Sequence, residues 1–195
     1  SMRYSSVESH GPALVRSLLA TGRHRVIYRP HPRTGIVLRS TTAAHDEIVR
    51  LIAAANKADA SAGHVVDTSG GFGWQLSVSD VAVMDISAVA YDWLATAKPL
   101  LVTQPAEPRA QLPESGLVRE LDLFTAADAA RAASVVDAAV TRPDESHAAL
   151  VRRYFGDTTP GASMARFLDA CDDVIRERSA ALAARAGSVL PGRRE

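Results

Sequence analysis

The sequence has few cysteines, few aromatic residues and no excess charge, and each shortage excludes a class of protein. One cysteine among 195 residues cannot form an internal disulfide, so a secreted domain stabilised by internal disulfides is excluded. The net charge is +0 and aromatic residues make up 5% of the chain, so neither a broad basic surface nor a row of stacking platforms is expected. Without these features, the chain is not expected to bind nucleic acid. No apolar run is long enough to cross a bilayer.

The remaining composition is that of an ordinary globular domain. Hydrophobic residues make up 47% of the chain and charged residues 23%, which is enough to bury one good core. We interpret residues 1–10 as a disordered tag or linker, residues 11–186 as one folded domain and residues 187–195 as a frayed tail. The single cysteine, Cys171, lies in a helical pattern and is interpreted as a buried small apolar residue.

Helical and extended patterns alternate along most of the chain. Apolar residues recur at spacings of three and four in the expected helices, and short β-branched runs bounded by proline or glycine mark the strands. Such alternation is typical of a parallel sheet with helices on both faces, so the expected fold class is α/β and Rossmann-like. The expected strands are 24–28, 65–66, 81–84, 100–103 and 117–123, and the expected helices are 11–21, 42–55, 74–79, 88–97, 125–140, 143–155 and 163–185.

The first candidate site follows the strand that ends at Tyr28. Two prolines stiffen the loop around His31, and the same loop carries the guanidinium groups of Arg29 and Arg33. Arginine binds phosphate through its planar fork, and histidine donates hydrogen bonds or a proton, so the loop suits a diphosphate. The alternative is a surface loop with solvated arginines and an incidental histidine.

The second candidate site is the turn between the third expected strand and the following helix. The first N–H groups of a helix have no partner within it, so the Ser87 hydroxyl with the N–H groups of Ala88 and Val89 suits a phosphate. In open α/β sheets, ligands bind at this edge, beyond the carboxyl ends of the strands. Asp85 would repel a phosphate and is interpreted as a brace for the turn, whereas Asp92, further along the helix, is a candidate to accept from a donor group. The alternative is that these side chains are ordinary helix caps.

A glycine-rich loop after the second expected strand is the third candidate. Thr68, Ser69 and Gly70 begin it, and its glycines let the backbone approach a base or a ribose. It lacks the lysine and the spacing of a P-loop, and it lacks the spacing of a dinucleotide fingerprint. A flexible turn is the alternative. The six histidines show no metal-ligand spacing, so neither a metal site nor a cofactor is expected.

Several short motifs follow one another in an order typical of a known family. They are Arg29-Pro30-His31-Pro32, Val65-Val66-Asp67, Ser79-Asp80, Met84-Asp85-Ile86-Ser87-Ala88, Tyr91-Asp92, Lys98-Pro99, Tyr154-Phe155-Gly156-Asp157 and Gly161-Ala162-Ser163. With them the chain resembles the C-terminal, nucleotide-binding half of the CDP-glycerol glycerophosphotransferases, which are polymerases and primases of teichoic acid synthesis with relatives in capsule synthesis. The resemblance extends from about residue 25 to residue 169.

The resemblance implies a fold, an activity and a set of residue roles. The family has the GT-B fold, with two Rossmann-like lobes and the donor nucleotide mainly in the C-terminal lobe. Its members transfer glycerol phosphate, or another polyol phosphate, from a CDP-linked donor to a polymer or lipid-linked acceptor. The roles that carry over are contact with the donor diphosphate for His31, Arg33 and Ser87, and catalysis at the leaving phosphate for His31. The implied partners are the donor, the acceptor and an N-terminal lobe of the same parent protein, and the implied location is cytoplasmic, at the inner face of the cell membrane.

One motif departs from the family pattern at three positions. Met84, Ile86 and Ala88 stand where the pattern has Thr, Tyr and Ser, so an aromatic ring and a hydroxyl are lost. The segment before His24 is too short for a second lobe, so this lobe is expected to have little activity alone. Two alternatives stay open. One is a GT-B glycosyltransferase lobe with a UDP-linked or other nucleotide-sugar donor, and the other is a catalytically silent binding module.

Overall fold

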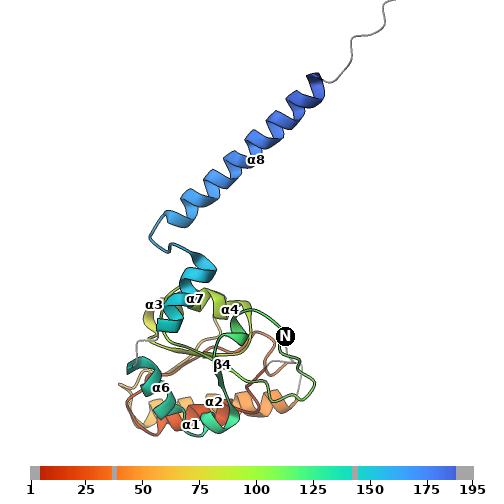
Figure 1. Cartoon of the computed structure of the whole chain (residues 1–195). Coiled ribbons are helices and arrows are strands. Elements are labelled where there is room, and N and C mark those ends of the chain that lie inside the picture. The colour runs from red at the N-terminus through yellow and green to blue at the C-terminus, as the bar shows by residue number, and fades with distance from the viewer. Residues whose placement is uncertain (1–4, 37–38, 142–144, 188–195) are drawn as a thin grey trace, which may run out of the picture. The chain divides into compact units, whose positions relative to one another are not determined.

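The computed structural model describes residues 5–36, 39–141 and 145–187. It consists of two compact units, Ser1–Val151 and Arg152–Glu195. The first unit holds short parallel strands flanked by helices, which confirms the predicted α/β class (Figure 1). The domain limits predicted from the sequence stay a prediction.

Helices and strands alternate along the chain as far as β5, in nearly the predicted order, and helices follow. The strands are β1 (Ile27–Tyr28), β2 (Val65–Val66), β3 (Ala82–Met84), β4 (Leu100–Thr103) and β5 (Leu123–Phe124). The helices are α1 (Gly11–Leu19), α2 (Arg39–Ala58), α3 (Trp74–Val78), α4 (Ala88–Leu94), the 3-10 turn η2 (Leu117–Arg119), α5 (Ala126–Ala129), α6 (Ala132–Thr141), α7 (Glu145–Phe155) and α8 (Ala162–Gly187).

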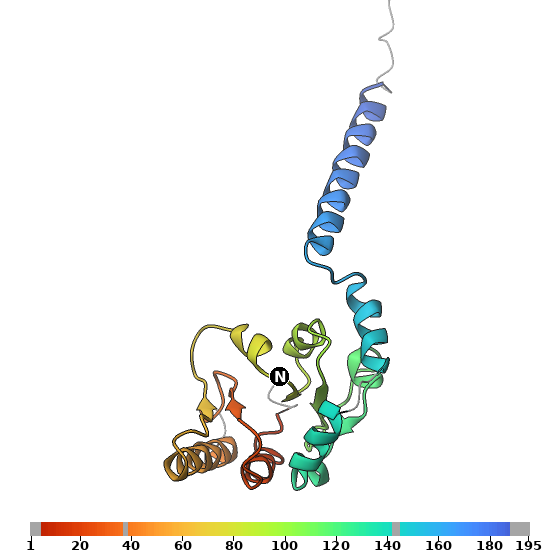
Figure 2. The same ribbon diagram turned by 90° about the vertical axis from the view of Figure 1, so that its left-hand side faces the viewer.

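Hydrogen bonds divide the strands into two open sheets, β1-β2 and β3-β4-β5, rather than the single sheet predicted. Every pair is parallel, with Ile27 opposite Val65 and Met84 opposite Val102. Helices α1, α2 and α6 lie on one side of the strands and α3 and α4 on the other (Figure 1, Figure 2). The first unit is therefore layered as helix, sheet and helix.

The main core lies between the strands and the helices α1, α2, α5 and α6. Its most buried members include Ile48 and Ala132, and Tyr28 and Val83 pack against it from the two sheets. On the other side of the strands, Trp93 is 2% exposed. Helices on both faces of the strands (Figure 2) explain why the strands are apolar.

Two expected elements differ from the structure where side chains replace backbone partners. The predicted strand 24–28 contracts to β1, since the Val26 N–H donates to His64 Nδ1 at 3.1 Å rather than to a neighbouring strand. The predicted helix 125–140 breaks into α5 and α6, and the Ser17 hydroxyl accepts from Ala133 N–H at 3.1 Å in the first turn of α6.

The remaining differences are local. The predicted strand 117–123 is a 3-10 turn followed by the shorter β5, because Gly116, at φ 90°, turns the chain just before it. The prediction that Cys171 is buried is wrong, since this residue is partly exposed on α8. Pro143, the predicted start of α7, lies outside the described residues.

Candidate functional site

The loops after β1 and β2 are joined through the carboxylate of Asp67. Arg29 Nη1 donates to Asp67 Oδ2 at 2.5 Å, and Arg29 Nη2 donates to the Ser69 carbonyl at 3.2 Å. The Ser69 hydroxyl and N–H donate to Asp67 Oδ1 at 2.6 Å and 2.9 Å, and Gln75 also donates to this carboxylate. These bonds, that of the Ser69 hydroxyl first, hold the pKa of Asp67 well below its ordinary value. Two predicted candidates, Arg29 and Ser69, are thus brought together. The Arg29 Cζ atom also lies 5.6 Å from the centroid of the Phe72 ring.

His31 and Arg33 lie at the exposed tip of the first loop. The Arg33 N–H donates to His31 Nδ1 at 3.1 Å, and the Thr34 N–H donates to the His31 carbonyl at 2.8 Å. Because Nδ1 accepts a hydrogen bond, the neutral ring carries its proton on Nε2. The turn therefore presents a ring N–H and a guanidinium to solvent from a loop held by two prolines.

The turn after β3 has a carboxylate with one oxygen held by two hydrogen bonds. Asp85 Oδ1 accepts from the Thr103 hydroxyl at 2.9 Å and from the Ser6 N–H at 3.0 Å. These bonds fit the predicted bracing role, since they tie the turn to β4 and to the N-terminal segment. Burial and, secondarily, the negative charge of Asp85 raise the pKa of Tyr28 to about 12.

The start of α4 is open to solvent. Ser87 is its N-cap, with extended backbone at φ −158°, and its side chain makes no capping hydrogen bond. Ser87, Ala88 and Val89 are all exposed, as is Asp92 on the same helix. The hydroxyl and the first N–H groups of the helix therefore face the solvent at the edge of the sheet, beside the end of β3.

The chain leaves β1 and β3 in opposite directions. From β1 it crosses through α2 to β2 on one side, and from β3 it crosses through α4 to β4 on the other. The two sheets lie side by side, so the loops 29–33 and 85–87 diverge where the strand order reverses (Figure 2). In open α/β proteins this reversal point forms the ligand crevice.

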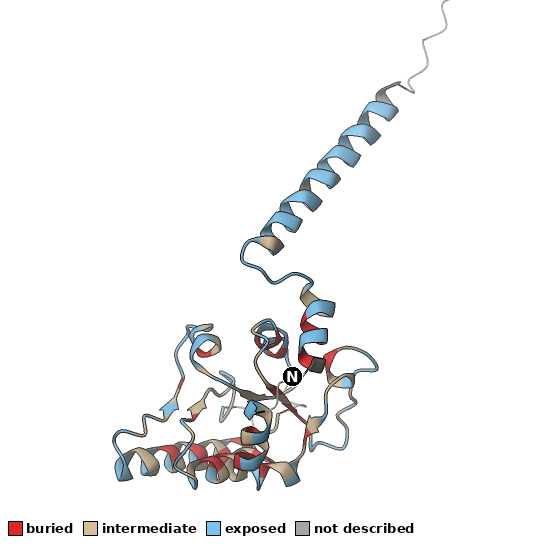
Figure 3. Cartoon of the chain, turned by 60° about the vertical axis from the view of Figure 1, so that its left-hand side comes forward, coloured by how far each residue is buried: buried red, intermediate tan, exposed pale blue. Residues whose placement is uncertain are grey.

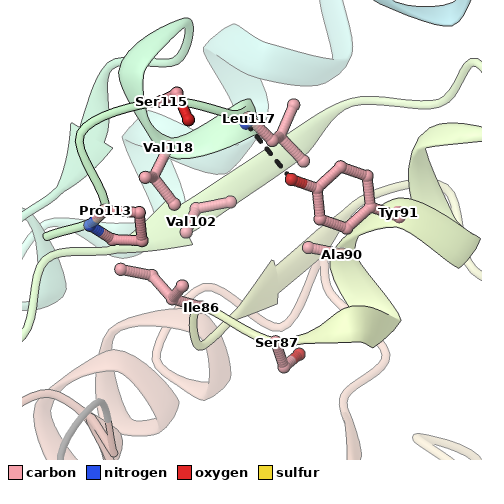
Figure 4. Close-up of a pocket in the computed structure, with 9 residues that line it drawn as sticks. All are labelled: Ile86, Ser87, Ala90, Tyr91, Val102, Pro113, Ser115, Leu117 and Val118. Atoms are coloured by element: carbon pink, nitrogen blue, oxygen red, sulfur yellow. Dashed lines mark hydrogen bonds between the residues drawn. The ribbon is translucent and has the colours of Figure 1, made fainter. Parts of the chain in front are cut away.

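A pocket of about 200 Å³ lies beside the start of α4 and was not predicted from the sequence. The loop before η2 closes it, and the Tyr91 hydroxyl accepts from the Leu117 N–H at 3.3 Å (Figure 4). Gly116 lies so close that an added Cβ would be 3.1 Å from the Tyr91 oxygen. The pocket suits a small uncharged group, because most of its wall is apolar. Its lining residues are Ile86, Ser87, Ala90, Tyr91, Val102, Pro113, Ser115, Leu117 and Val118.

The feature of the sequence that indicates this pocket is the long proline-rich loop 104–116, which follows β4. Asp67 and Gln75 were not selected as site residues. Their role is to hold Arg29, which lies 38 residues before Asp67, and no local pattern in the sequence shows that contact. Lys98 was noted only as part of a motif. Its ammonium group donates to the carbonyls of Leu76 and Ser79 at 2.9 Å and 2.8 Å, and so closes the end of α3.

Within the described ranges, no group of three or more His, Cys, Asp or Glu side chains is arranged to hold a metal ion. None of the helices in this part of the chain is long and apolar enough to cross a membrane. Comparison with protein-family models and with curated proteins finds no match for this chain. A function is therefore inferred from the geometry of the site and from the motifs in the sequence.

Proposed function

We propose that the first unit is the donor-nucleotide-binding lobe of a GT-B type transferase that moves glycerol phosphate, or another polyol phosphate, from a CDP-linked donor to a cell-wall or capsule polymer. The observation that carries this proposal is the divergence of the loops after β1 and β3 at the reversal of strand order. Both loops hold phosphate-binding chemistry, and a nucleotide diphosphate is long enough to touch both.

The diphosphate is bound by groups from both loops. Arg33 and the Nε2–H of His31 approach from one side, and the Ser87 hydroxyl with the N–H groups of Ala88 and Val89 approaches from the other. The Arg29 guanidinium is held by Asp67, so it supplies a fixed positive potential rather than a new ion pair. Asp92 repels phosphate, and its carboxylate suits a hydroxyl of the donor.

The transfer step breaks the bond between the CMP phosphate and the glycerol phosphate. An acceptor hydroxyl attacks the glycerol-bearing phosphorus, and CMP leaves with the electron pair of the bridging oxygen. Donors aimed at the leaving phosphate stabilise the charge that develops there, and His31 donates a hydrogen bond or a proton to it. The base that deprotonates the acceptor belongs to the N-terminal lobe implied by the family, so the present chain binds donor and transfers little by itself.

A silent binding module is the second candidate, and two observations favour it. The pocket of about 200 Å³ is smaller than the roughly 300 Å³ at which ligand pockets usually begin. Ala88 also removes one hydroxyl that the family pattern supplies.

Calorimetric titration separates the candidates. The chain is titrated with CDP-glycerol, CDP, CMP, UDP and UDP-glucose, and the titration is repeated with His31→Ala and Ser87→Ala. The proposal predicts binding of CDP ligands that weakens in both variants, with CMP weaker than CDP because it lacks one phosphate. A preference for UDP ligands would move the donor to a nucleotide sugar. Absence of binding by all five ligands would favour the silent module and contradict the donor site.

A further inference from the structure

The long helix α8 carries an apolar stripe along one side. On a helical wheel its members fall within about 120°. The six large ones are 48–64% exposed, and Figure 3 draws nearly the whole helix as exposed. The α8 stripe consists of Met164, Phe167, Leu168, Cys171, Val174, Ile175 and Leu182.

Such a stripe differs from the scattered apolar residues of an ordinary surface. Contiguous exposed apolar side chains mark an interaction surface, and a single helix in water is marginal without a partner for its apolar face. The start of α8 is fixed, because Arg166 Nη2 donates to the carbonyls of Phe155 and Asp157 at 3.0 Å each. The stripe is therefore presented by a helix whose direction is anchored at the end of α7.

The charges of the polar face argue against a membrane as the partner. Helices that lie on anionic membranes are rich in Lys and Arg on that face. Here four acidic residues accompany two arginines, so this face lacks the excess of basic residues that binding to an anionic surface requires. The charged residues of that face are Arg166, Asp169, Asp172, Asp173, Arg176 and Glu177.

The charges along the helix fit a second copy that runs in the opposite direction. The first half of α8 has three aspartates and one arginine, and the second half has three arginines and one glutamate. Arg178 lies on the stripe itself. In a parallel pair in register, each Arg178 would face its own copy, which is unfavourable. In an antiparallel pair centred on Ile175, Leu168 meets Leu182 and the acidic half of each helix lies along the basic half of the other.

We propose that the α8 stripe joins two copies of this chain in an antiparallel helix pair. Ile175 packs on its own copy, Leu168 packs on Leu182 of the second copy, and the acidic half of each helix lies along the basic half of the other. Cys171 enters the seam as a small apolar residue. The pair is isologous, so the same patch serves both copies and the assembly closes at two.

The oligomeric state of the full chain tests the pairing. Sedimentation across the micromolar range is expected to give a species of twice the 20.7 kDa mass of one chain. Ile175→Glu places two unpaired carboxylates at the centre of the seam and is expected to weaken the dimer at least about 100-fold. Ala180→Glu adds the same charge to the polar face and is expected to leave the dimer unchanged. A monomeric wild-type chain, or an Ile175→Glu chain that still dimerises, would overturn the proposal.

Cysteine cross-linking tests the direction of the helices. In a Cys171→Ser background, chains with Leu168→Cys are mixed with chains that carry Leu182→Cys and are oxidised mildly. The antiparallel pair predicts a disulfide between the two kinds of chain and little within either kind. Cross-linking of each kind with itself would show a parallel pair and contradict the charge argument.

Discussion

Replacing Lys98 with methionine is expected to destabilise the first unit through the end of α3. The ammonium group donates to the carbonyls of Leu76, Ser77 and Ser79 at 2.9, 3.2 and 2.8 Å. It also lies 5.8 Å from the centroid of the Trp93 ring. A cation on the last carbonyls of a helix complements the negative end of its dipole. Methionine keeps the apolar stem but removes every one of these polar contacts.

The expected loss is about 2 kcal/mol. A hydrogen bond from a charged donor contributes roughly 1.5–3 kcal/mol. The two shorter bonds carry most of it, and water that replaces the ammonium group returns part of the energy. For a unit of this size the change corresponds to about 6 °C in the unfolding midpoint temperature.

Urea unfolding, followed by tryptophan fluorescence and circular dichroism, measures the effect. The midpoint is expected to fall while the slope of unfolding free energy against urea stays constant. Lys57→Met is the matched control, because Lys57 is exposed at the end of α2 and its loss is expected to change stability by less than about 0.5 kcal/mol. A Lys98→Met chain as stable as this control would refute the reasoning.

Three further predictions concern Gly116, His10 and Asp67. Gly116→Ala is expected to cost about 2 kcal/mol in thermal unfolding, because alanine is strained at φ 90° and its Cβ would crowd the Tyr91 hydroxyl; unchanged stability would contradict the close approach. Burial lowers the pKa of His10, so the stability that the neutral ring contributes is complete above the ordinary value of 6.5 and falls as the pH drops below it. His10→Gln is expected to flatten the dependence of the urea midpoint on pH. Because the pKa of His64 is also lowered, the same measurement on His64→Gln shows how much of that dependence belongs to His64. Asp67→Asn is expected to speed hydrogen exchange in the loop after β2, and to remove the part of the stability that is lost as pH falls below 3.8; exchange rates equal to those of the wild type would contradict its bracing role.

The sequence predicted the class of the fold because periodicity is a local signal. The strands at 65–66 and 100–103 and the long C-terminal helix lie where apolar patterns and turn residues indicate them. The loops that follow β1 and β3 were selected because parallel strands bring their carboxyl ends to the same edge, and their role as a site stays a prediction.

What the sequence could not predict depends on contacts between distant residues. The Arg29–Asp67 ion pair and the Ser17 hydroxyl at the start of α6 join residues far apart in the chain. The division into two sheets arises in the same way, because strand pairing depends on tertiary packing rather than on propensity. The exposure of Cys171 had no local signal either, since a helical stripe looks alike whether it faces a core or a partner.

The most direct test of the proposed donor site is an amide nuclear magnetic resonance titration of the chain with CDP. The account predicts that CDP shifts the amide signals of residues 29–33 and 86–90 together, at one dissociation constant, and that Ser87→Ala weakens both sets of shifts. Shifts confined to one loop, or elsewhere in the chain, would contradict a diphosphate held between the ends of β1 and β3.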